Sequence, residues 1–279
     1  LAVSAAAVSV AVLAGGVLGL LAAYYRGWLE RVSMRLMDML FDRYGVAAVG
    51  FDIVWAERDT SSGMQVLDAL ATKELKDAAG FQSAYQQLRG GLDYDGMFAR
   101  SIKGRPVVLG YYLSSEENAV RVNAIPGPVL PKGTFAGRAI PFTQWKGYTG
   151  NLPIYLENAA NAGHINPIID DDGIVRRVPM LVELDGAYYE SFSLAVVRTL
   201  LRIEDKERGF PPVEPGFPAD GYAGMEWLQV GPLRIPVDEN AATLVPYHGK
   251  KFSFLYVSLA DVLADRVKPE QLKGKLALV

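Results

Sequence analysis

The feature that most constrains this chain is its first 25 residues, which carry no charge. As a helix rising about 1.5 Å per residue, this run would reach roughly 37 Å, more than the roughly 30 Å of a bilayer hydrocarbon core. Arg26 ends the apolar run, and Trp28 adds to an aromatic belt at the expected interface. A cleaved signal peptide is the alternative, since Ala22 and Ala23 are small residues near a possible cut, but the run exceeds an ordinary signal core. We therefore expect residues 1–25 to form one transmembrane helix in the lipid bilayer.

Small residues recur at every fourth position of this segment, at Ala7, Ala11, Gly15, Gly19 and Ala23. Small side chains at this spacing let two helix backbones approach closely, which is how transmembrane helices pair. About half of the segment is Ala, Gly or Ser, so such a stripe also arises by chance. Ala11, Gly15 and Gly19 are the candidate helix-pairing residues.

An amphipathic stalk is predicted over residues 26–43. Apolar residues follow helical spacing on one face, and charged residues occupy the other. The apolar face comprises Leu29, Val32, Leu36, Leu40 and Phe41, and the charged face Arg31, Arg35, Asp38 and Asp42. We expect the apolar face to pack on the following domain or on the stalk of a second copy, with interfacial membrane binding as the alternative. The predicted partner is thus the chain itself, as a homodimer.

Composition excludes several classes of function. The net charge is −3 and the basic clusters are short, so nothing favours nucleic-acid binding. The chain has no cysteine, which excludes disulfides and thiol catalysis, and only two histidines, which leave little for a zinc site. Half of the residues are hydrophobic and 21% are charged, as in a folded domain rather than a disordered chain.

Strand and helix signals alternate through residues 44–279, which predicts an α/β domain with a mixed β-sheet covered by helices. Predicted strands are residues 46–55, 107–113, 174–184, 243–247 and 275–279, with a hairpin over 228–237. Predicted helices are residues 64–89 with a break at Gly80, then 95–102, 154–162, 191–203 and 258–265, the last two with serine caps. Pro179 predicts that residues 174–184 form an edge or bulged strand. Residues 126–153 are rich in glycine and proline and are predicted to lack regular structure.

Residues 163–179 hold the densest group of chemically active side chains, with three aspartates before Gly173. An EF-hand loop would need an oxygen ligand at Ile168 and a glutamate at Pro179, and it has neither. Two interpretations stay open: a cation held in another geometry by Asp170 and Asp172, or a tight turn in which Gly173 takes a positive φ.

Catalytic patterns are weak, and no catalytic or metal-binding residue is assigned. Ser191, His164 and Asp170 could be written as a triad, but no serine lies in a G-x-S-x-G elbow. No phosphate-binding glycine motif is present. Asp52 and Glu57 form a loose carboxylate pair, which keeps an anchored hydrolase as an alternative. For His164 a structural role and a pH-sensing role both stay open.

Four stretches of sequence together carry a family resemblance. They are residues 45–59 (GVAAVGFDIVWAERD), 92–99 with 106–111 (LDYDGMFA, PVVLGY), 159–166 with 170–179 and 189–195 (AANAGHIN, DDDGIVRRVP, YESFSLA), and 235–238, 245–249, 258–263 and 272–279 (IPVD, VPYHG, SLADVL, LKGKLALV). In these stretches the chain resembles the type-two CHASE domain, a sensory extracellular domain associated with cyclases and histidine kinases.

The resemblance implies one transmembrane helix, a periplasmic or extracellular sensor, and a cytoplasmic output module at a bacterial inner membrane. Output modules in this family include class III adenylate or guanylate cyclases, histidine kinases and Ser/Thr kinases. The insert between Tyr111 and Tyr155 is most similar to members that carry a cyclase. No cofactor is expected in this region, whereas an attached cyclase module would need a divalent metal.

One departure from the family concerns the junction after the stalk. Family members usually place a strand with an Asp-Glu pair and a Trp-Pro-Trp-Pro-Arg segment there, but residues 41–45 (FDRYG) pass straight into the first strand. We therefore expect the domain 44–279 to be incomplete at the 43/44 junction, and also at its C-terminus.

The combined prediction is the sensory and dimerisation region of a bacterial membrane receptor, with an adenylate cyclase as the favoured output. The sensor of a histidine or Ser/Thr kinase, an anchored hydrolase and a pure scaffold are the alternatives. Candidate residues for sensing an unknown extracytoplasmic ligand are His164, Asp170, Asp172, Arg176 and Arg177.

Overall fold

The structure is a computed structural model that describes residues 28–205, 209–219, 224–250 and 252–279. None of the helices in these residues is both long enough and apolar enough to cross a membrane. The predicted transmembrane helix 1–25 and its pairing residues Ala11, Gly15 and Gly19 lie outside the described residues. The chain divides into two compact units, one of residues 1–38 and 58–101 and the other of residues 39–57 and 102–279.

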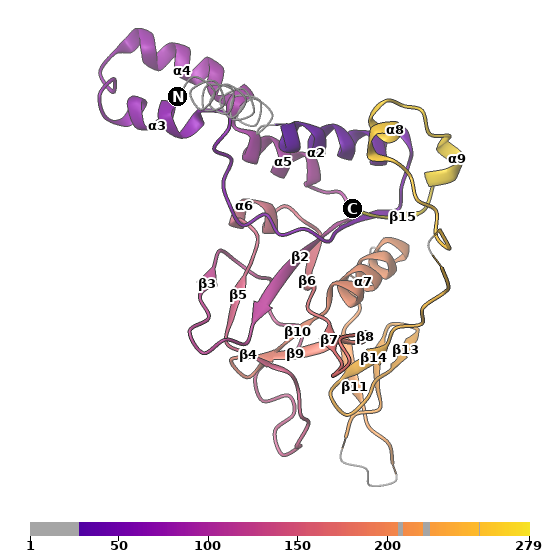
Figure 1. The fold of residues 1–279 in the computed structure, drawn as a ribbon. Helices are drawn as coiled ribbons and strands as arrows, with labels where there is room; N and C mark the ends of the chain where they lie inside the picture. The colour runs from indigo at the N-terminus through magenta and orange to yellow at the C-terminus, as the bar shows by residue number, and fades with distance from the viewer. Residues whose placement is uncertain (1–27, 206–208, 220–223, 251) are drawn as a thin grey trace, which may run out of the picture. The chain divides into compact units, whose positions relative to one another are not determined.

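The first unit is helical in its described part. It contains α2 (Trp28–Asp38), α3 (Met64–Thr72), α4 (Ala79–Leu92) and nearly all of α5 (Tyr94–Ile102). The predicted helix 64–89 is two helices, α3 and α4, which lie side by side and antiparallel (Figure 1). α3 ends at Thr72, before the predicted break at Gly80. The side-chain amide of Gln82 donates to the Ala71 and Leu75 carbonyls, at 2.8 and 3.1 Å, and so satisfies carbonyls at and just after the end of α3.

The second unit begins with a five-residue π-helix, η1 (Met39–Arg43), and is built on a mixed six-stranded sheet, as predicted. β15 (Leu276–Leu278), β1 (Ala48–Phe51), β2 (Val107–Ser114) and β6 (Asn161–His164) pair in parallel in that order. β5 (Gly147–Thr149) pairs antiparallel with the carboxyl half of β2, and β3 (Arg121–Val122) pairs with β5. The strand predicted over residues 46–55 is shorter in the structure, where β1 begins at Ala48 and the chain leaves the sheet after Phe51.

Two buried asparagines complete the hydrogen bonding of β2. Asn151 donates to the Gly110 carbonyl and accepts from the Trp55 amide, both at 2.8 Å. Asn166 accepts from the Leu113 amide and donates to its carbonyl, again at 2.8 Å. Each side chain therefore replaces a strand partner, which keeps the backbone of a buried strand satisfied.

The predicted helix 154–162 is wrong over most of its length. Only α6 (Pro153–Leu156) is helical, and β6 follows at Asn161. The sequence there favours helix, but β2 needs a parallel partner at Val108–Tyr111, and β6 supplies it. Tertiary pairing thus overrides local propensity.

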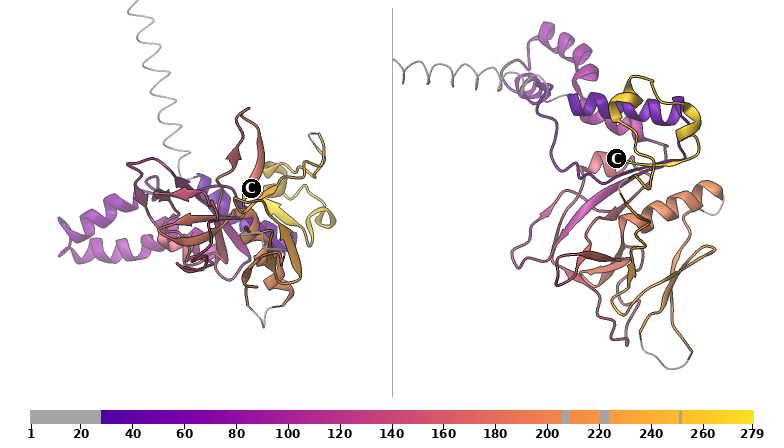
Figure 2. Two further views of the ribbon diagram at one scale, coloured as in Figure 1. Left: turned by 90° about the horizontal axis from the view of Figure 1, so that it is seen from below. Right: turned by 45° about the vertical axis from the view of Figure 1, so that its right-hand side comes forward.

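α7 (Phe192–Glu204) packs on β2 and β6, as Figures 1 and 2 show. Its predicted serine cap is confirmed, because the Ser191 hydroxyl accepts from the Leu194 amide at 3.2 Å. Gly163 is required under this helix start, since a Cβ there would lie 2.5 Å from the Phe192 backbone. α8 (Leu259–Leu263) also follows a serine, Ser258, but that side chain makes no capping bond.

Three small sheets complete the second unit. They are β10 (Ala187–Glu190), β9 (Leu181–Leu184) and β4 (Gln144–Trp145); β11 (Val213–Gly216), β12 (Trp227–Val230) and β13 (Leu233–Pro236); and β14 (Ala242–Leu244), β8 (Val175–Pro179) and β7 (Ile168–Ile169). The hairpin predicted over 228–237 is confirmed as β12–β13. β4 and β5 fall inside residues 126–153, which were predicted to lack regular structure. The remaining helix is α9 (Pro269–Leu272).

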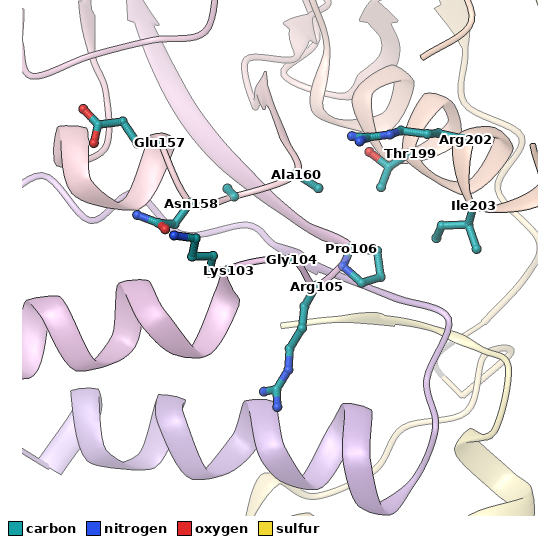
Figure 3. A pocket seen from close by; sticks show the side chains of 11 residues that line it. Lys103, Gly104, Arg105, Pro106, Glu157, Asn158, Ala160, Thr199, Arg202 and Ile203 are labelled. Carbon is teal, nitrogen blue, oxygen red and sulfur yellow. The ribbon is translucent and has the colours of Figure 1, made fainter. Parts of the chain in front are cut away.

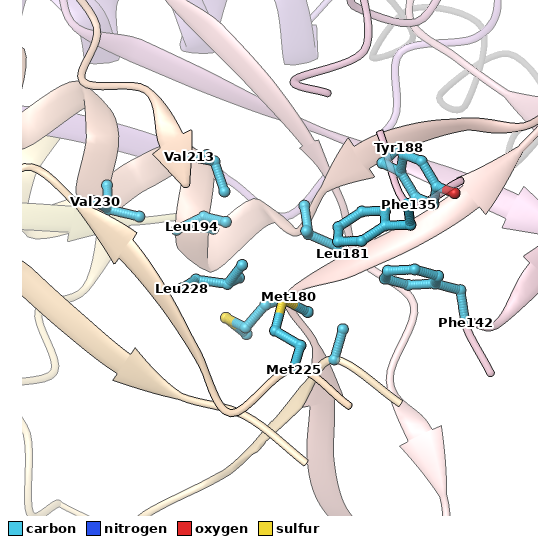
Figure 4. Close-up of a cluster of buried hydrophobic side chains, with 11 residues drawn as sticks. Phe135, Phe142, Met180, Leu181, Tyr188, Leu194, Val213, Met225, Leu228 and Val230 are labelled. Atoms are coloured by element: carbon cyan, nitrogen blue, oxygen red, sulfur yellow. The ribbon is translucent and has the colours of Figure 1, made fainter. Parts of the chain in front are cut away.

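The strand predicted over 174–184 is two strands in different sheets, and β8 is the middle strand of its sheet rather than an edge. The change occurs at Met180, whose amide donates to Ala241 and whose carbonyl accepts from Ser191. Pro179 ends β8 opposite Ala242, where the ladder stops. Met180 lies in a buried cluster with Phe135, Phe142, Leu181, Tyr188, Leu194, Val213, Met225, Leu228, Val230 and Ala241 (Figure 4).

Candidate functional site

The three aspartates of residues 170–172 form the turn of the β7–β8 hairpin. The Gly173 amide donates to the Asp170 carbonyl at 2.8 Å, and the Ile174 amide donates to the Asp172 carboxylate at 3.1 Å. Gly173 has a φ of 79°, the left-handed conformation that favours glycine. The tight turn predicted here is confirmed.

Four of the five predicted sensing residues meet at this hairpin. Arg176 bridges Asp170 and Asp172, at 2.8 and 2.7 Å. Arg177 pairs with Asp170 at 3.1 Å and with Asp238 at 3.4 Å. We define the hairpin ion-pair cluster as Asp170, Asp172, Arg176, Arg177 and Asp238. Arg176 lowers the pKa of Asp172 by hydrogen bonding, which is expected when a guanidinium stabilises a carboxylate.

Each aspartate of the hairpin ion-pair cluster already faces an arginine, although its three aspartates share only two arginines. Among the described residues, no group of three His, Asp or Glu side chains is arranged to hold a metal. A groove of about 650 Å³ lies beside the cluster and is lined by Arg177, Asp238 and Glu239 among others. Its charges are mixed, so the groove does not favour an anion or a cation.

His164 does not join the hairpin ion-pair cluster. Its side chain is 1% exposed, and within the part of the chain that the structure describes neither ring nitrogen has a hydrogen-bond partner. The Tyr111 ring lies edge-on, with 6.5 Å between ring centroids, and its hydroxyl is also buried without a partner. Burial lowers the pKa of His164 from 6.5 to about 3, because the charged imidazolium would lose its hydration. His164 therefore stays neutral between pH 5 and 8, which gives the pH-sensing hypothesis no support.

A buried ion pair near His164 was not predicted from the sequence. The Arg198 guanidinium of α7 contacts the Glu190 carboxylate at 2.5 Å, and Asn161 donates to the same oxygen at 3.2 Å. The other Glu190 oxygen has no partner, and burial raises the pKa of Glu190. We call Tyr111, His164, Asn161, Glu190 and Arg198 the buried polar cluster. Spacing gives no signal for it, because its residues come from four separate elements.

A second unpredicted site is a pocket of about 550 Å³ at the amino ends of β2 and β6, lined also by the end of α7 (Figure 3). Lys103 and Asn158 lie on one side, with Arg202 and Thr199 on the other. We call it the basic pocket, because its charged lining residues are Lys103, Arg105, Arg202 and a single acid, the exposed Glu157. Its volume suits a small ligand.

Arg105 connects the basic pocket to the segment that follows the stalk helix. Its guanidinium pairs with Asp42 of η1 at 2.8 Å and lies over the Phe41 ring at 5.5 Å. The next residue of η1, Arg43, pairs with Asp265 at 2.9 Å, and the buried Tyr44 hydroxyl donates to the same carboxylate. The C-terminal part of the predicted stalk, η1, thus belongs to the second unit and is held there by two ion pairs.

The residues proposed for catalysis do not assemble. Both His164 nitrogens lack partners, so His164 bonds neither Ser191 nor Asp170. The Ser191 hydroxyl instead caps α7. Asp52 and Glu57 are exposed at the end of β1. A triad needs its nucleophile and base within hydrogen-bond reach, and that contact is missing here.

The described residues form a mixed α/β domain with a solvent-facing pocket. The CHASE2 domain family matches residues 23–279, and the chain belongs to that family. CHASE2 domains are extracellular sensor domains of signalling receptors, so this chain is such a sensor. No curated protein and no solved structure matches the chain.

Proposed function

We propose that the chain is the sensory and dimerisation region of a bacterial inner-membrane receptor that controls a class III adenylate cyclase module. An extracytoplasmic ligand would change how the stalks of two copies are arranged, and this change would bias the dimeric output. Residues 1–25 would hold the region in the membrane. The cyclase module, with its divalent metal, would carry all of the chemistry.

The observation that carries this proposal is that two loops of the second unit hold η1, which is the first element of that unit. The Asp42–Arg105 and Arg43–Asp265 ion pairs join the end of the stalk to the loop before β2 and to the loop after α8. A ligand that moves either loop therefore acts directly on the stalk. Exposed ion pairs contribute little stability, typically below about 1 kcal/mol each, so signalling could change them easily.

The experiment expresses the full-length protein in a bacterial strain that lacks its own adenylate cyclase and measures cAMP. We expect cAMP above the empty-vector level. We also expect the double variant Asp42→Asn/Arg43→Gln to change this level by severalfold at equal membrane abundance, because the stalk is released. Asp185→Asn/Arg121→Gln, which breaks an exposed ion pair that does not involve η1, is the matched control and should leave cAMP unchanged.

Two outcomes would overturn the proposal or part of it. Absence of cAMP together with phosphorylation from labelled ATP would replace the cyclase with a kinase output. Equal cAMP from the wild type and the double variant would reject η1 as the transmitting contact.

A further inference from the structure

We propose that the basic pocket binds a small ligand through an oxyanion group, a phosphate or a carboxylate, and that this ligand competes with Asp42 for Arg105. This inference names a ligand class for the sensor and so rests on the proposed function. The site differs from the sensing residues predicted from the sequence, which lie in the hairpin ion-pair cluster or are buried.

The charges of the basic pocket favour an anion. Within the described residues, neither Lys103 nor Arg202 has a carboxylate partner, and both side chains are exposed. Figure 3 shows them on opposite sides of the pocket, so an oxyanion entering it meets a cation from each side. An arginine fork binds carboxylates and phosphates through two parallel hydrogen bonds, and a lysine adds a mobile point charge.

Arg202 also has a structural role that the test must separate from binding. It lies in the last turn of α7, where a cation complements the helix dipole, and it lies over the Phe210 ring at 4.5 Å. Lys103 carries no such second role: it is exposed and has no partner among the described residues. Lys103 is therefore the cleaner position to substitute.

Arg105 gives the pocket a link to signalling. It lines the pocket, yet its guanidinium extends to Asp42. Its side chain is 23% exposed, and a long flexible arginine can turn toward a new anion. An oxyanion in the pocket would compete with Asp42 for the Arg105 guanidinium. The difference in free energy between these two pairings couples ligand binding to η1.

The experiment titrates the 279-residue chain, purified in a nonionic detergent, with inorganic phosphate and separately with acetate. Isothermal titration calorimetry and thermal melting are the readouts, and sodium chloride of equal ionic strength is the salt control. We expect saturable binding of at least one of the two anions with no equivalent response to chloride. Phosphate and acetate distinguish the two oxyanion chemistries.

Variants locate the site and test the competition. Lys103→Gln and Arg202→Gln should weaken binding by about tenfold or more, since each removes a charge-assisted contact, and Lys103→Arg should restore it. Arg234→Gln is the matched control for Arg202, because Arg234 also lies over an aromatic ring, Trp227, at 3.6 Å, but outside the pocket. Asp42→Asn should tighten binding, because it removes a carboxylate that competes with the ligand for Arg105.

Binding that is absent, equal for chloride, or equally weakened by Arg234→Gln would overturn the oxyanion site. Unchanged or weaker binding in Asp42→Asn would overturn the competition. Melting of each variant without ligand separates lost binding from lost folding. Since binding is measured without any output module, failure here leaves the cyclase proposal standing, and failure of the cyclase proposal leaves this result standing.

Discussion

The hairpin ion-pair cluster and the buried polar cluster both consist of residues that carry charge or titrate, yet their environments are opposite. In the hairpin ion-pair cluster, Arg176 is 43% exposed and Asp172 is 53% exposed, and each of the cluster's three carboxylates faces a guanidinium. In the buried polar cluster, Glu190 is 3% exposed and one of its oxygens has no hydrogen-bond partner among the described residues, nor has either ring nitrogen of His164. The sequence makes the first cluster conspicuous but singles out only His164 of the second.

This difference shows that a dense group of charged residues in the sequence does not indicate a large contribution to the free energy of folding. Neighbouring aspartates and arginines can satisfy one another on the surface, where water screens them. Charges brought together from distant elements into the core are costly to desolvate, so each depends strongly on its partner. Four substitutions test this contrast.

The largest effect is expected from Arg198→Met, which leaves the Glu190 carboxylate without its cation inside the fold. We expect a loss of about 3–5 kcal/mol in the free energy of unfolding, measured by urea titration. The double variant Glu190→Gln/Arg198→Met should recover much of the loss, because no buried charge then remains. A loss below about 1 kcal/mol for the single variant would show that the pair is not buried in solution.

The next effect is expected from Asn166→Ala. It removes both hydrogen bonds to the Leu113 backbone in a buried strand and should destabilise the fold by about 2–4 kcal/mol, at about 1–2 kcal/mol for each of the two orphaned groups. Asn158→Ala is the matched control, since Asn158 makes one exposed bond, to Ile154. Equal losses for the two variants would contradict the role of Asn166 as a strand partner.

A pH-dependent effect is expected from His164. Its folded pKa, about 3, lies below the unfolded value near 6.5, so below pH 6.5 the unfolded chain takes up a proton that the folded chain does not. Stability from this residue should therefore fall as the pH drops from about 6.5 toward 3, by up to about 1.4 kcal/mol per pH unit.

The His164→Phe variant isolates this contribution from that of Glu190, whose raised pKa acts in the opposite direction. At pH 7 the variant should be as stable as the wild type or more stable, because two unpartnered nitrogens are replaced by carbon. Urea titrations at pH 7, 6, 5 and 4 supply the comparison. Parallel curves for the wild type and the variant would show that His164 reaches water or a partner.

The smallest effect is expected from Asp172→Asn in the hairpin ion-pair cluster. The pair is exposed, so the free energy of unfolding should change by less than about 1 kcal/mol, and less still at high salt. Urea titrations at low and high sodium chloride would measure this. A large, salt-independent loss would place the hairpin in an environment as buried as that of Glu190.

Parts of the fold follow from local sequence because they depend on local forces. The Asp170–Gly173 turn and the Ser191 cap each follow from side chains that bond their own backbone. β12 and β13 follow from short-range pairing across a tight connection. These elements were predicted correctly because the local interactions that form them can be recognised in the sequence.

Other parts depend on partners far away in sequence. β6 is a strand because β2 requires a neighbour, and β8 ends at Pro179 because Met180 bonds two other segments. The basic pocket combines the loop before β2, the turn after α6 and the end of α7. These three segments lie far apart in the sequence and share no motif that would link them. The sequence therefore located the hairpin ion-pair cluster but neither the basic pocket nor the buried polar cluster.

The central claim, a dimeric sensor that acts through its stalk, is tested most directly by cysteine cross-linking in membranes. The chain has no cysteine, so single cysteines can be placed at each of positions 32–38 and oxidised in native membranes. We predict disulfide-linked dimers at positions that recur with helical periodicity, and a changed rate when Asp42→Asn/Arg43→Gln is added. Absence of linked dimers at every position, or rates unaffected by releasing η1, would contradict the account.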